Sequence, residues 1–203
     1  GELDATTRSV SRSHNTFKSL PNGIVAWPVR EKNIREADAI LVKTCYFDND
    51  ETGAAFIDAL TKKAKDGVPV FVQYDVKASE ADKLAVFDRG LRRRYDIPQR
   101  FEALRAAGAI VIPVNAGDWH FTTRKDHEKY QITQHRGEPV RLIGGGMNIG
   151  DWYRHGGDPP RKFETFVRYG YRDTDYELTG PTAGDVLDEF VTDAERALAQ
   201  NLA

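Results

Sequence analysis

Two short apolar runs separated by the length of one helix constrain the fold of this chain more than any other feature. Residues 39–47 and 68–75 are rich in the branched and aromatic residues that favour β-strands. From residue 54 onward, apolar side chains recur at helical spacing until Gly67 ends the segment. A strand, a helix and a strand joined this closely predict a crossover unit with two parallel strands.

The same order of elements repeats once and then changes. Residues 100–107 are expected to form a helix ended by Gly108, followed by a strand at 109–114. Further along, the sequence predicts strands at 128–134 and 140–143 joined by a hairpin turn at 135–138, strands at 163–171 and 176–178, and an amphipathic helix at 183–202. The fold class is therefore α/β, with a mixed sheet covered by helices.

The length and composition predict one domain. A chain of 203 residues, 40% of them hydrophobic, can bury one core. Residues 1–15 are polar and lack an apolar period, so we expect an N-terminal arm followed by a folded domain at 16–203. The formal net charge of -2 argues against a surface that is basic overall, so any attraction for phosphate must be local.

Residues that suit phosphate chemistry gather around the predicted hairpin. His127 and Lys129 are two residues apart on a predicted strand, so both side chains emerge from the same face. The hairpin returns the chain so that the glycine run 144–146 and Asn148 lie beside them. In such a cluster an imidazole attacks phosphorus, while an ammonium and an amide hold the phosphate oxygens.

The order of these residues resembles the signature of the phospholipase D superfamily. The chain has His127-x-Lys129 and, downstream, Gly145-Gly146-x-Asn148. The flanks 124–126 and 149–151 are similar to those of cardiolipin synthase-like members, and the resemblance extends roughly from residue 39 to the end.

The resemblance implies a phospholipase D-like α-β-α sandwich and a reaction that uses neither a metal nor a cofactor. It implies that His127 forms a phosphohistidine, helped by Lys129. It also assigns Asp173 to the carboxylate that orients the histidine, and Gly146 and Asn148 to substrate binding.

Two departures from the family pattern concern the hairpin. Gln134 stands where the signature has Asp, and the chain between the two motifs is about four residues longer than is usual in the family. Gln134 accepts a hydrogen bond but carries no charge, so a modest loss of activity or an altered hairpin is expected.

The larger departure is that the motif occurs once, whereas the family mechanism uses two histidines. None of the other histidines is followed two residues later by lysine: His14, His120, His135 and His155. The second half-site is therefore expected either from an identical copy of the chain or from a C-terminal half that this sequence lacks. The start at Gly1, without Met, favours a trimmed, longer protein.

The sequence leaves three functions open. The first is a phosphodiesterase or phosphatidyltransferase acting on phospholipid, preferred over nucleic acid because of the 149–151 flank and the acidic net charge. The alternatives are a nuclease-like homodimeric phosphodiesterase and a degenerate phosphate-binding or assembly module. The single cysteine, Cys45, excludes an internal disulfide and leaves the compartment undetermined, with membrane-associated, periplasmic or secreted locations preferred.

Overall fold

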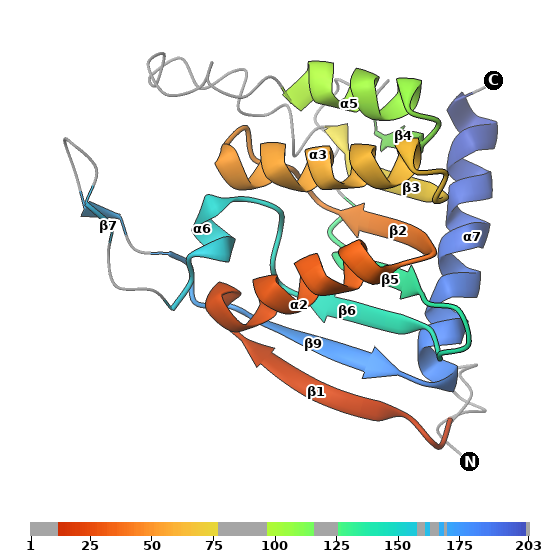
Figure 1. Ribbon diagram of the computed structural model, residues 1–203, viewed down its shortest axis with the longest axis horizontal. Helices are drawn as coiled ribbons and strands as arrows, with labels where there is room; N and C mark the ends of the chain where they lie inside the picture. The colour runs from red at the N-terminus through yellow and green to blue at the C-terminus, as the bar shows by residue number, and fades with distance from the viewer. Residues whose placement is uncertain are drawn as a thin grey trace.

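The computed structural model describes residues 12–76, 97–115, 126–157, 161–162, 167–168 and 170–201 (Figure 1). In chain order the elements are β1 (Thr16–Pro21), α2 (Gly23–Glu36), β2 (Ala39–Thr44), α3 (Glu51–Lys65), β3 (Val70–Asp75), α5 (Ile97–Ala106), β4 (Ile110–Val114), β5 (Tyr130–Gln134), β6 (Arg141–Gly145), α6 (Asp151–Arg154), β7 (Arg161–Lys162), β8 (Val167–Arg168), β9 (Thr174–Thr179) and α7 (Pro181–Asn201).

The main sheet is mixed, as the sequence predicts. Its strand order is β1-β9-β6-β5-β2-β3-β4. The predicted crossover unit is confirmed, since β2 and β3 pair in parallel, and β4 pairs in parallel with β3. The predicted hairpin is confirmed too: β5 and β6 pair antiparallel, and Gly137 in the turn has a φ of 77° that suits glycine.

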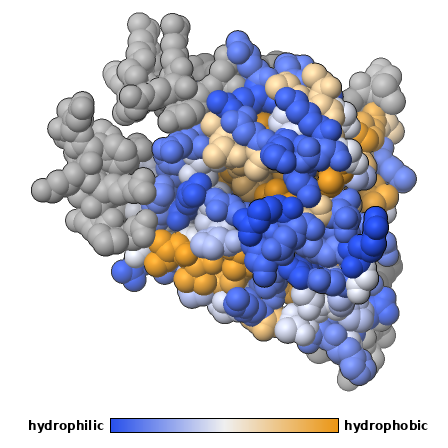
Figure 2. All heavy atoms as spheres, in the orientation of Figure 1, coloured by the Kyte–Doolittle hydropathy of each residue, from blue (hydrophilic) through white to orange (hydrophobic). Residues whose placement is uncertain are grey.

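Helices cover both faces of the sheet and complete the predicted sandwich (Figure 1). On one face, α2, α3 and α5 pack against the even-numbered residues of β2, and this core includes Phe56, Ile57 and Leu60 of α3. On the other face, Phe190 of α7 packs among side chains from the central strands. Figure 2 shows a largely hydrophilic surface interrupted by hydrophobic patches, and Ile24 at the start of α2 is 45% exposed.

The first strand and first helix were not predicted as elements, although the fold was expected to start near residue 16. β1 is an edge strand in which Leu20 alone is buried, so it shows no alternating apolar pattern. The buried positions of α2 include Arg30 and Asn33. These side chains donate hydrogen bonds to carboxylates of β9, so the inward face of α2 is partly polar.

The predicted strand at 163–171 is wrong as one continuous element. Within it, residues 163–166 and 169 lie outside the described residues, and the described part contains only β8 and irregular chain. β8 pairs with β7 in a separate two-stranded sheet. The prediction of a polar arm also falls mostly outside the described residues. Within its last part, Arg12 forms an ion pair with Asp185 of α7.

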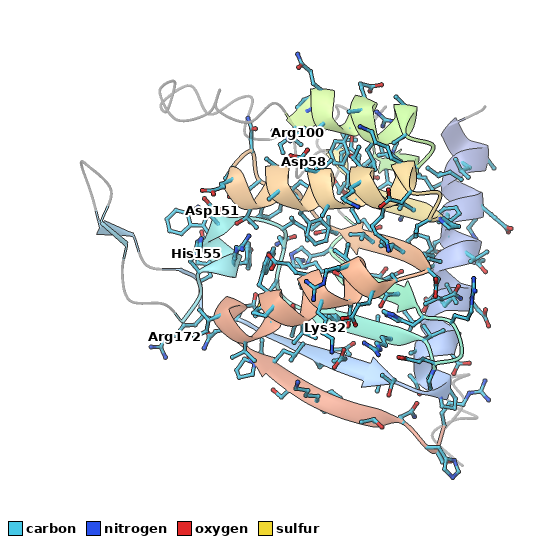
Figure 3. The ribbon with its side chains drawn as sticks, in the orientation of Figure 1. Lys32, Asp58, Arg100, Asp151, His155 and Arg172 are labelled. Atoms are coloured by element: carbon cyan, nitrogen blue, oxygen red, sulfur yellow. The ribbon has the colours of Figure 1, made fainter. Side chains whose placement is uncertain are left out.

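The starts of α3 and α6 are joined by reciprocal carboxylate caps. Asp50 accepts hydrogen bonds from the backbone N–H groups of Gly53 and Asp151, at 2.8 and 2.6 Å. Asp151 in turn accepts from the backbone N–H of Thr52 at 3.0 Å. Figure 3 places Asp151 beside the start of α3, and it also shows the pair of Arg100 and Asp58 that ties α5 to α3. These contacts fix the position of the loop that follows β6.

Asp50 should make stability depend on pH. Burial raises the pKa of Asp50 to about 6 from its usual 3.8, although the backbone donors oppose the shift. The folded state therefore holds this proton more tightly than the unfolded state, and the free energy of unfolding should fall as the pH rises from about 4 to about 6. In Asp50→Asn the fall in unfolding free energy between about pH 4 and about pH 6 should be smaller, as measured by thermal unfolding at a series of pH values. Asp66→Asn, which removes an exposed carboxylate whose pKa is lowered by Lys62, should leave the fall in place.

The buried pair of Arg30 and Asp175 should dominate the stability of this side of the sheet. The two side chains are 2% and 0% exposed and approach to 2.7 Å. Arg30→Leu leaves the carboxylate of Asp175 buried and unpaired, so we expect a loss of about 3–5 kcal/mol in denaturant unfolding. Arg12→Leu, which breaks an exposed pair, is the control and should change stability little. Equal losses in the two variants would contradict this ranking.

Candidate active site

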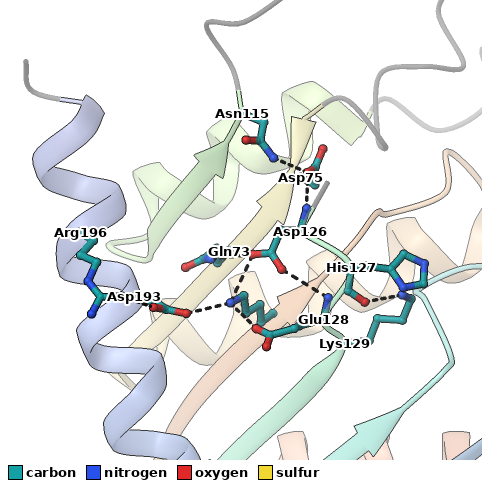
Figure 4. Close-up of polar contacts among 10 residues, drawn as sticks. Gln73, Asp75, Asn115, Asp126, His127, Glu128, Lys129, Asp193 and Arg196 are labelled. Atoms are coloured by element: carbon teal, nitrogen blue, oxygen red, sulfur yellow. Dashed lines mark hydrogen bonds and ion pairs between the residues drawn. The ribbon is translucent and has the colours of Figure 1, made fainter. Parts of the chain in front are cut away.

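The segment 126–129 directly precedes β5 and lies outside the regular strands. Figure 4 shows the side chains of His127 and Lys129 on one side of this segment and those of Asp126 and Glu128 on the other. The alternation is that of extended backbone, so His127 and Lys129 share one side as predicted. The prediction that both lie on a strand is wrong, because β5 begins only at Tyr130. The side chain of His127 is exposed, whereas Lys129 is only 5% exposed. The histidine therefore lies open to a substrate next to a buried cation.

The ammonium of Lys129 has no carboxylate within ion-pair distance among the residues that the structure describes. Its Nζ donates a hydrogen bond to the backbone oxygen of His127 at 2.7 Å. Burial lowers the pKa of Lys129, and the nearby acidic groups of Cys45 and Asp173 oppose that shift. A buried ammonium held only by a neutral oxygen retains most of its capacity to bind an anion.

The glycine run lets the chain pass very close to the segment that begins β9. A Cβ atom added at Gly145, whose φ is 152°, would lie 2.4 Å from Oδ1 of Asp175. At Gly146 an added Cβ would lie 2.2 Å from Oδ1 of Asp173. An added Cβ at Gly145 would also meet backbone atoms of Thr174 and Asp175, so a larger residue there would displace β9, whereas at Gly146 it would displace the Asp173 side chain. The glycines thus leave room for the Asp173 carboxylate beside the loop.

Asn148 is buried, and its amide orientation is fixed by three neighbours. Its Oδ1 accepts from the backbone N–H of Tyr46 at 3.3 Å and from Oγ1 of Thr44 at 3.5 Å. Its Nδ2 donates to the hydroxyl of Tyr153 at 3.0 Å. The backbone N–H of Tyr46 can only donate, so the Asn148 atom that it contacts is the oxygen Oδ1. The Asn148 amide nitrogen therefore faces away from β2, and it uses one of its two N–H groups to bond to Tyr153.

The structure brings most of the predicted site residues to one end of β2. Lys129 interacts electrostatically with Cys45 and with Asp173, and Asp173 lies against Gly146. Asn148 lies at the same end through its bond to the residue after Cys45. The role predicted for Asp173 stays a prediction. Its Oδ1 accepts from the backbone N–H of Thr174 at 2.7 Å, and no hydrogen bond joins it to the ring of His127 among the described residues.

Gln134 lies far from this cluster. It is exposed at the end of β5, five residues beyond Lys129, which corresponds to about 16 Å along a strand. A side chain at that distance does not reach a phosphate held by Lys129. The side chain of Gln134 therefore makes no direct contact with the cluster.

Three contributors were not predicted from the sequence. The hydroxyls of Tyr46 and Tyr153 lie 3.1 Å apart and the pair supports Asn148. Tyr46 is in the predicted strand 39–47 and Tyr153 in a segment without a predicted element, and neither position signals this role. Lys43 was read as part of an apolar strand, and a lysine inside such a run is the signal that was available. No group of three His, Cys, Asp or Glu side chains in the described ranges is arranged to hold a metal ion.

Solved structures identify the class of fold. Nuc from Salmonella typhimurium, a phospholipase D family member, matches with a TM-score of 0.58 and 13% identity over 92% of this chain and 96% of its own. Phosphatidylserine synthase from Haemophilus influenzae matches with a TM-score of 0.56 and 18% identity, over 87% of this chain and 36% of its own. No protein-family profile matches. The chain therefore has the fold of these solved structures, one of which is a phospholipase D family member.

In sequence the chain is similar to cardiolipin synthase A. The protein of that name from Pseudomonas putida strain W619 is 27% identical over 190 residues, which is 89% of this chain and 33% of the relative. The protein from strain F1 is 28% identical over 189 residues, with the same two coverages. The chain thus spans about a third of the length of the curated relatives it matches.

The close approach at Gly146 yields a test of the site. Gly146→Ala places a methyl group against the Asp173 carboxylate, so we expect a loss of about 1–3 kcal/mol in stability and a weaker affinity for vanadate. Gly184→Ala is the matched control, because an added Cβ meets nothing within 4 Å there. Gly184 lies in the first turn of α7, where alanine should raise stability by less than about 1 kcal/mol. Calorimetry and vanadate titration measure both effects, and unchanged vanadate binding by Gly146→Ala would contradict the assignment.

Proposed function

We propose that the chain is the histidine-bearing half of a phospholipase D-type phosphodiesterase or phosphatidyltransferase that acts on phospholipid. The observation that carries the proposal is the buried ammonium of Lys129, without a carboxylate partner in the described part of the chain, beside the exposed imidazole of His127. The proposed half-domain spans residues 16–203, with the preceding residues as an arm.

The residues divide the proposed reaction between them. A ring nitrogen of His127 attacks phosphorus, the bond to the leaving oxygen breaks, and an acid from a second half-site protonates that oxygen. Lys129 holds a non-bridging oxygen, and the N–H of Asn148 that Tyr153 does not use donates to the same group, with Gly146 allowing close approach. Asp173 compensates the charge of the imidazolium from beside Gly146. Water or an alcohol then attacks the phosphohistidine and restores the free imidazole.

Phospholipid is the preferred substrate because the relatives with detectable sequence similarity are named cardiolipin synthase A. A location at or near a membrane, in the periplasm or outside the cell, fits such a substrate. The described helices include none that is both long and apolar enough to cross a bilayer.

A homodimeric, nuclease-like phosphodiesterase is the second candidate, and it has one observation in its favour. Nuc from Salmonella typhimurium and NucT from Helicobacter pylori are matched over 96% of their own lengths, so chains of this size occur with this fold. At 13% and 12% sequence identity, these matches support a shared fold but give no support for a shared substrate. The third candidate, a degenerate module, rested partly on Gln134, whose exposed position removes that support.

Mixing wild-type and His127→Ala chains tests whether the second half-site is an identical copy. If every site takes one histidine from each subunit, an equal mixture should retain about a quarter of the wild-type activity, because only wild-type pairs are active. If the second half comes from a different polypeptide segment, activity should need that segment and fall to about half in the same mixture. Hydrolysis of phosphatidylglycerol in mixed micelles and of bis(p-nitrophenyl) phosphate measures the activity and separates lipid from generic substrates. Robust turnover by a strictly monomeric chain contradicts both arrangements.

A further inference from the structure

The segment that carries His127 is held mainly by side chains. Strand pairing of β5 begins at Tyr130 on both of its sides, so 126–129 lie outside the regular ladder. One backbone bond reaches the end of the segment, from the N–H of Gly145 to the oxygen of Lys129. The position of the imidazole therefore depends on the contacts that the flanking residues Asp126 and Glu128 make.

Both flanking carboxylates converge on one lysine. The Nζ atom of Lys43, in β2, lies 3.3 Å from Oδ2 of Asp126 and forms an ion pair with Glu128 as well (Figure 4). A third carboxylate, that of Asp193 on α7, lies 3.2 Å away. Lys43 is 4% exposed. Its partners are more open, since the side chains of Asp126 and Asp193 are 22% and 31% exposed. The buried ammonium therefore reaches outward to carboxylates near the surface.

Further hydrogen bonds complete the arrangement on the same side. Oδ2 of Asp75 accepts from the backbone N–H of Asp126 at 2.8 Å, and Nε2 of Gln73 donates to Oδ2 of Asp126 at 3.1 Å. These partners belong to β3, so Asp126 is tied to two neighbouring parallel strands at once. The ammonium of Lys43 is the one cation among the described groups that touches both flanks of His127.

We propose that Lys43 is a positioning residue for the nucleophile: by holding Asp126 and Glu128 on the α7 side of the sheet, it forces His127 to the opposite side. In an extended chain, neighbouring side chains point to opposite faces. When Asp126 and Glu128 are both held on one face, the side chain of His127 between them can only point to the other. The proposal rests on the proposed role of His127. It adds that the orientation of His127 is set from the face of the sheet remote from the substrate.

The charge balance explains why a lysine is needed at this position. Without its ammonium, three carboxylates would lie close together and lose the cation that they share, and like charges at this range repel. Burial alone lowers the pKa of Lys43, but the bond to Glu128 and the surrounding acidic groups outweigh it and raise the pKa above the usual value. Lys43, Asp126 and Glu128 together form a clamp, and its ammonium therefore stays charged over the working range of an enzyme.

Helix α7 is coupled to the nucleophile through this clamp. Asp193 bonds to Lys43 and also forms an ion pair with Arg196 one turn further along the helix, at 3.2 Å. Asp193 contacts Lys43 from the side opposite to Asp126 and Glu128. Loss of the Asp193 carboxylate should therefore weaken the hold on Lys43 but leave both of its other ion pairs in place. Asp193→Asn should therefore have a smaller effect than loss of the lysine.

The test compares Lys43→Met and Lys43→Arg with Lys62→Met, which removes an exposed lysine paired on the surface of α3. Each variant is assayed with the second half-site supplied, and amide hydrogen exchange of 126–130 and the titration of the His127 ring are followed by NMR. For Lys43→Met we expect kcat to fall about a hundredfold, with KM unchanged within about threefold, since misplacement of a reacting group acts on the chemical step. The Asp126 amide should lose protection, and Lys43→Arg should restore part of both signals.

The outcomes separate this inference from the proposed function. Wild-type kcat and wild-type protection of 126–130 in a folded Lys43→Met protein overturn the inference. A fall in activity and protection that is matched by Lys62→Met, or that follows global unfolding seen by circular dichroism, overturns it as well. If no assembly of the wild-type chain is active while the loss of protection is specific to Lys43, the proposed function fails and the clamp stands as a structural feature.

Discussion

The buried ion pair between Arg30 and Asp175 is the interaction on which the site side of the molecule depends. Arg30 donates two hydrogen bonds to Oδ2 of Asp175, and Oδ1 accepts from the backbone N–H of Met147 at 3.2 Å. One carboxylate thus connects α2, β9 and the end of the glycine run. Because buried charges are tolerated only when they are paired and hydrogen-bonded, the three elements must assemble together.

This arrangement sets the two walls of the candidate site. The wall formed by β9 and the glycine run is held by close backbone approach, which brings the carboxylate of Asp173 beside Gly146. The wall that carries His127 is held by charge, through Lys43 and its carboxylate partners on the other face of the sheet. The buried ammonium of Lys129 lies between them. The candidate site is therefore positioned by rigid elements behind it, as precise chemistry requires.

The sequence predicts the elements whose inward faces are apolar and misses those whose inward faces are polar. The crossover helix α3 buries Phe56 and Leu60, and its helical period is plain. Helix α2 turns Arg30 inward, so its pattern resembles that of a surface segment. The cluster of His127 and Lys129 follows from local spacing in the chain. The contacts of Lys43 with α7 join residues 150 positions apart, which no local pattern encodes.

The pairing of β1 with β9 has a consequence for the order in which the chain acquires its structure. Within the described sheet β1 has β9 as its one neighbour, and β9 is synthesised roughly 150 residues later. At about 5–20 residues per second, the first strand waits on the order of 8–30 s for its partner to leave the ribosome. The parallel strands β2, β3 and β4 can pair before then, whereas β1 must remain unpaired, with Phe17 and Leu20 in water. The part of the molecule that contains the candidate site needs β9 and Asp175, so it is the last part that can fold as the polypeptide grows.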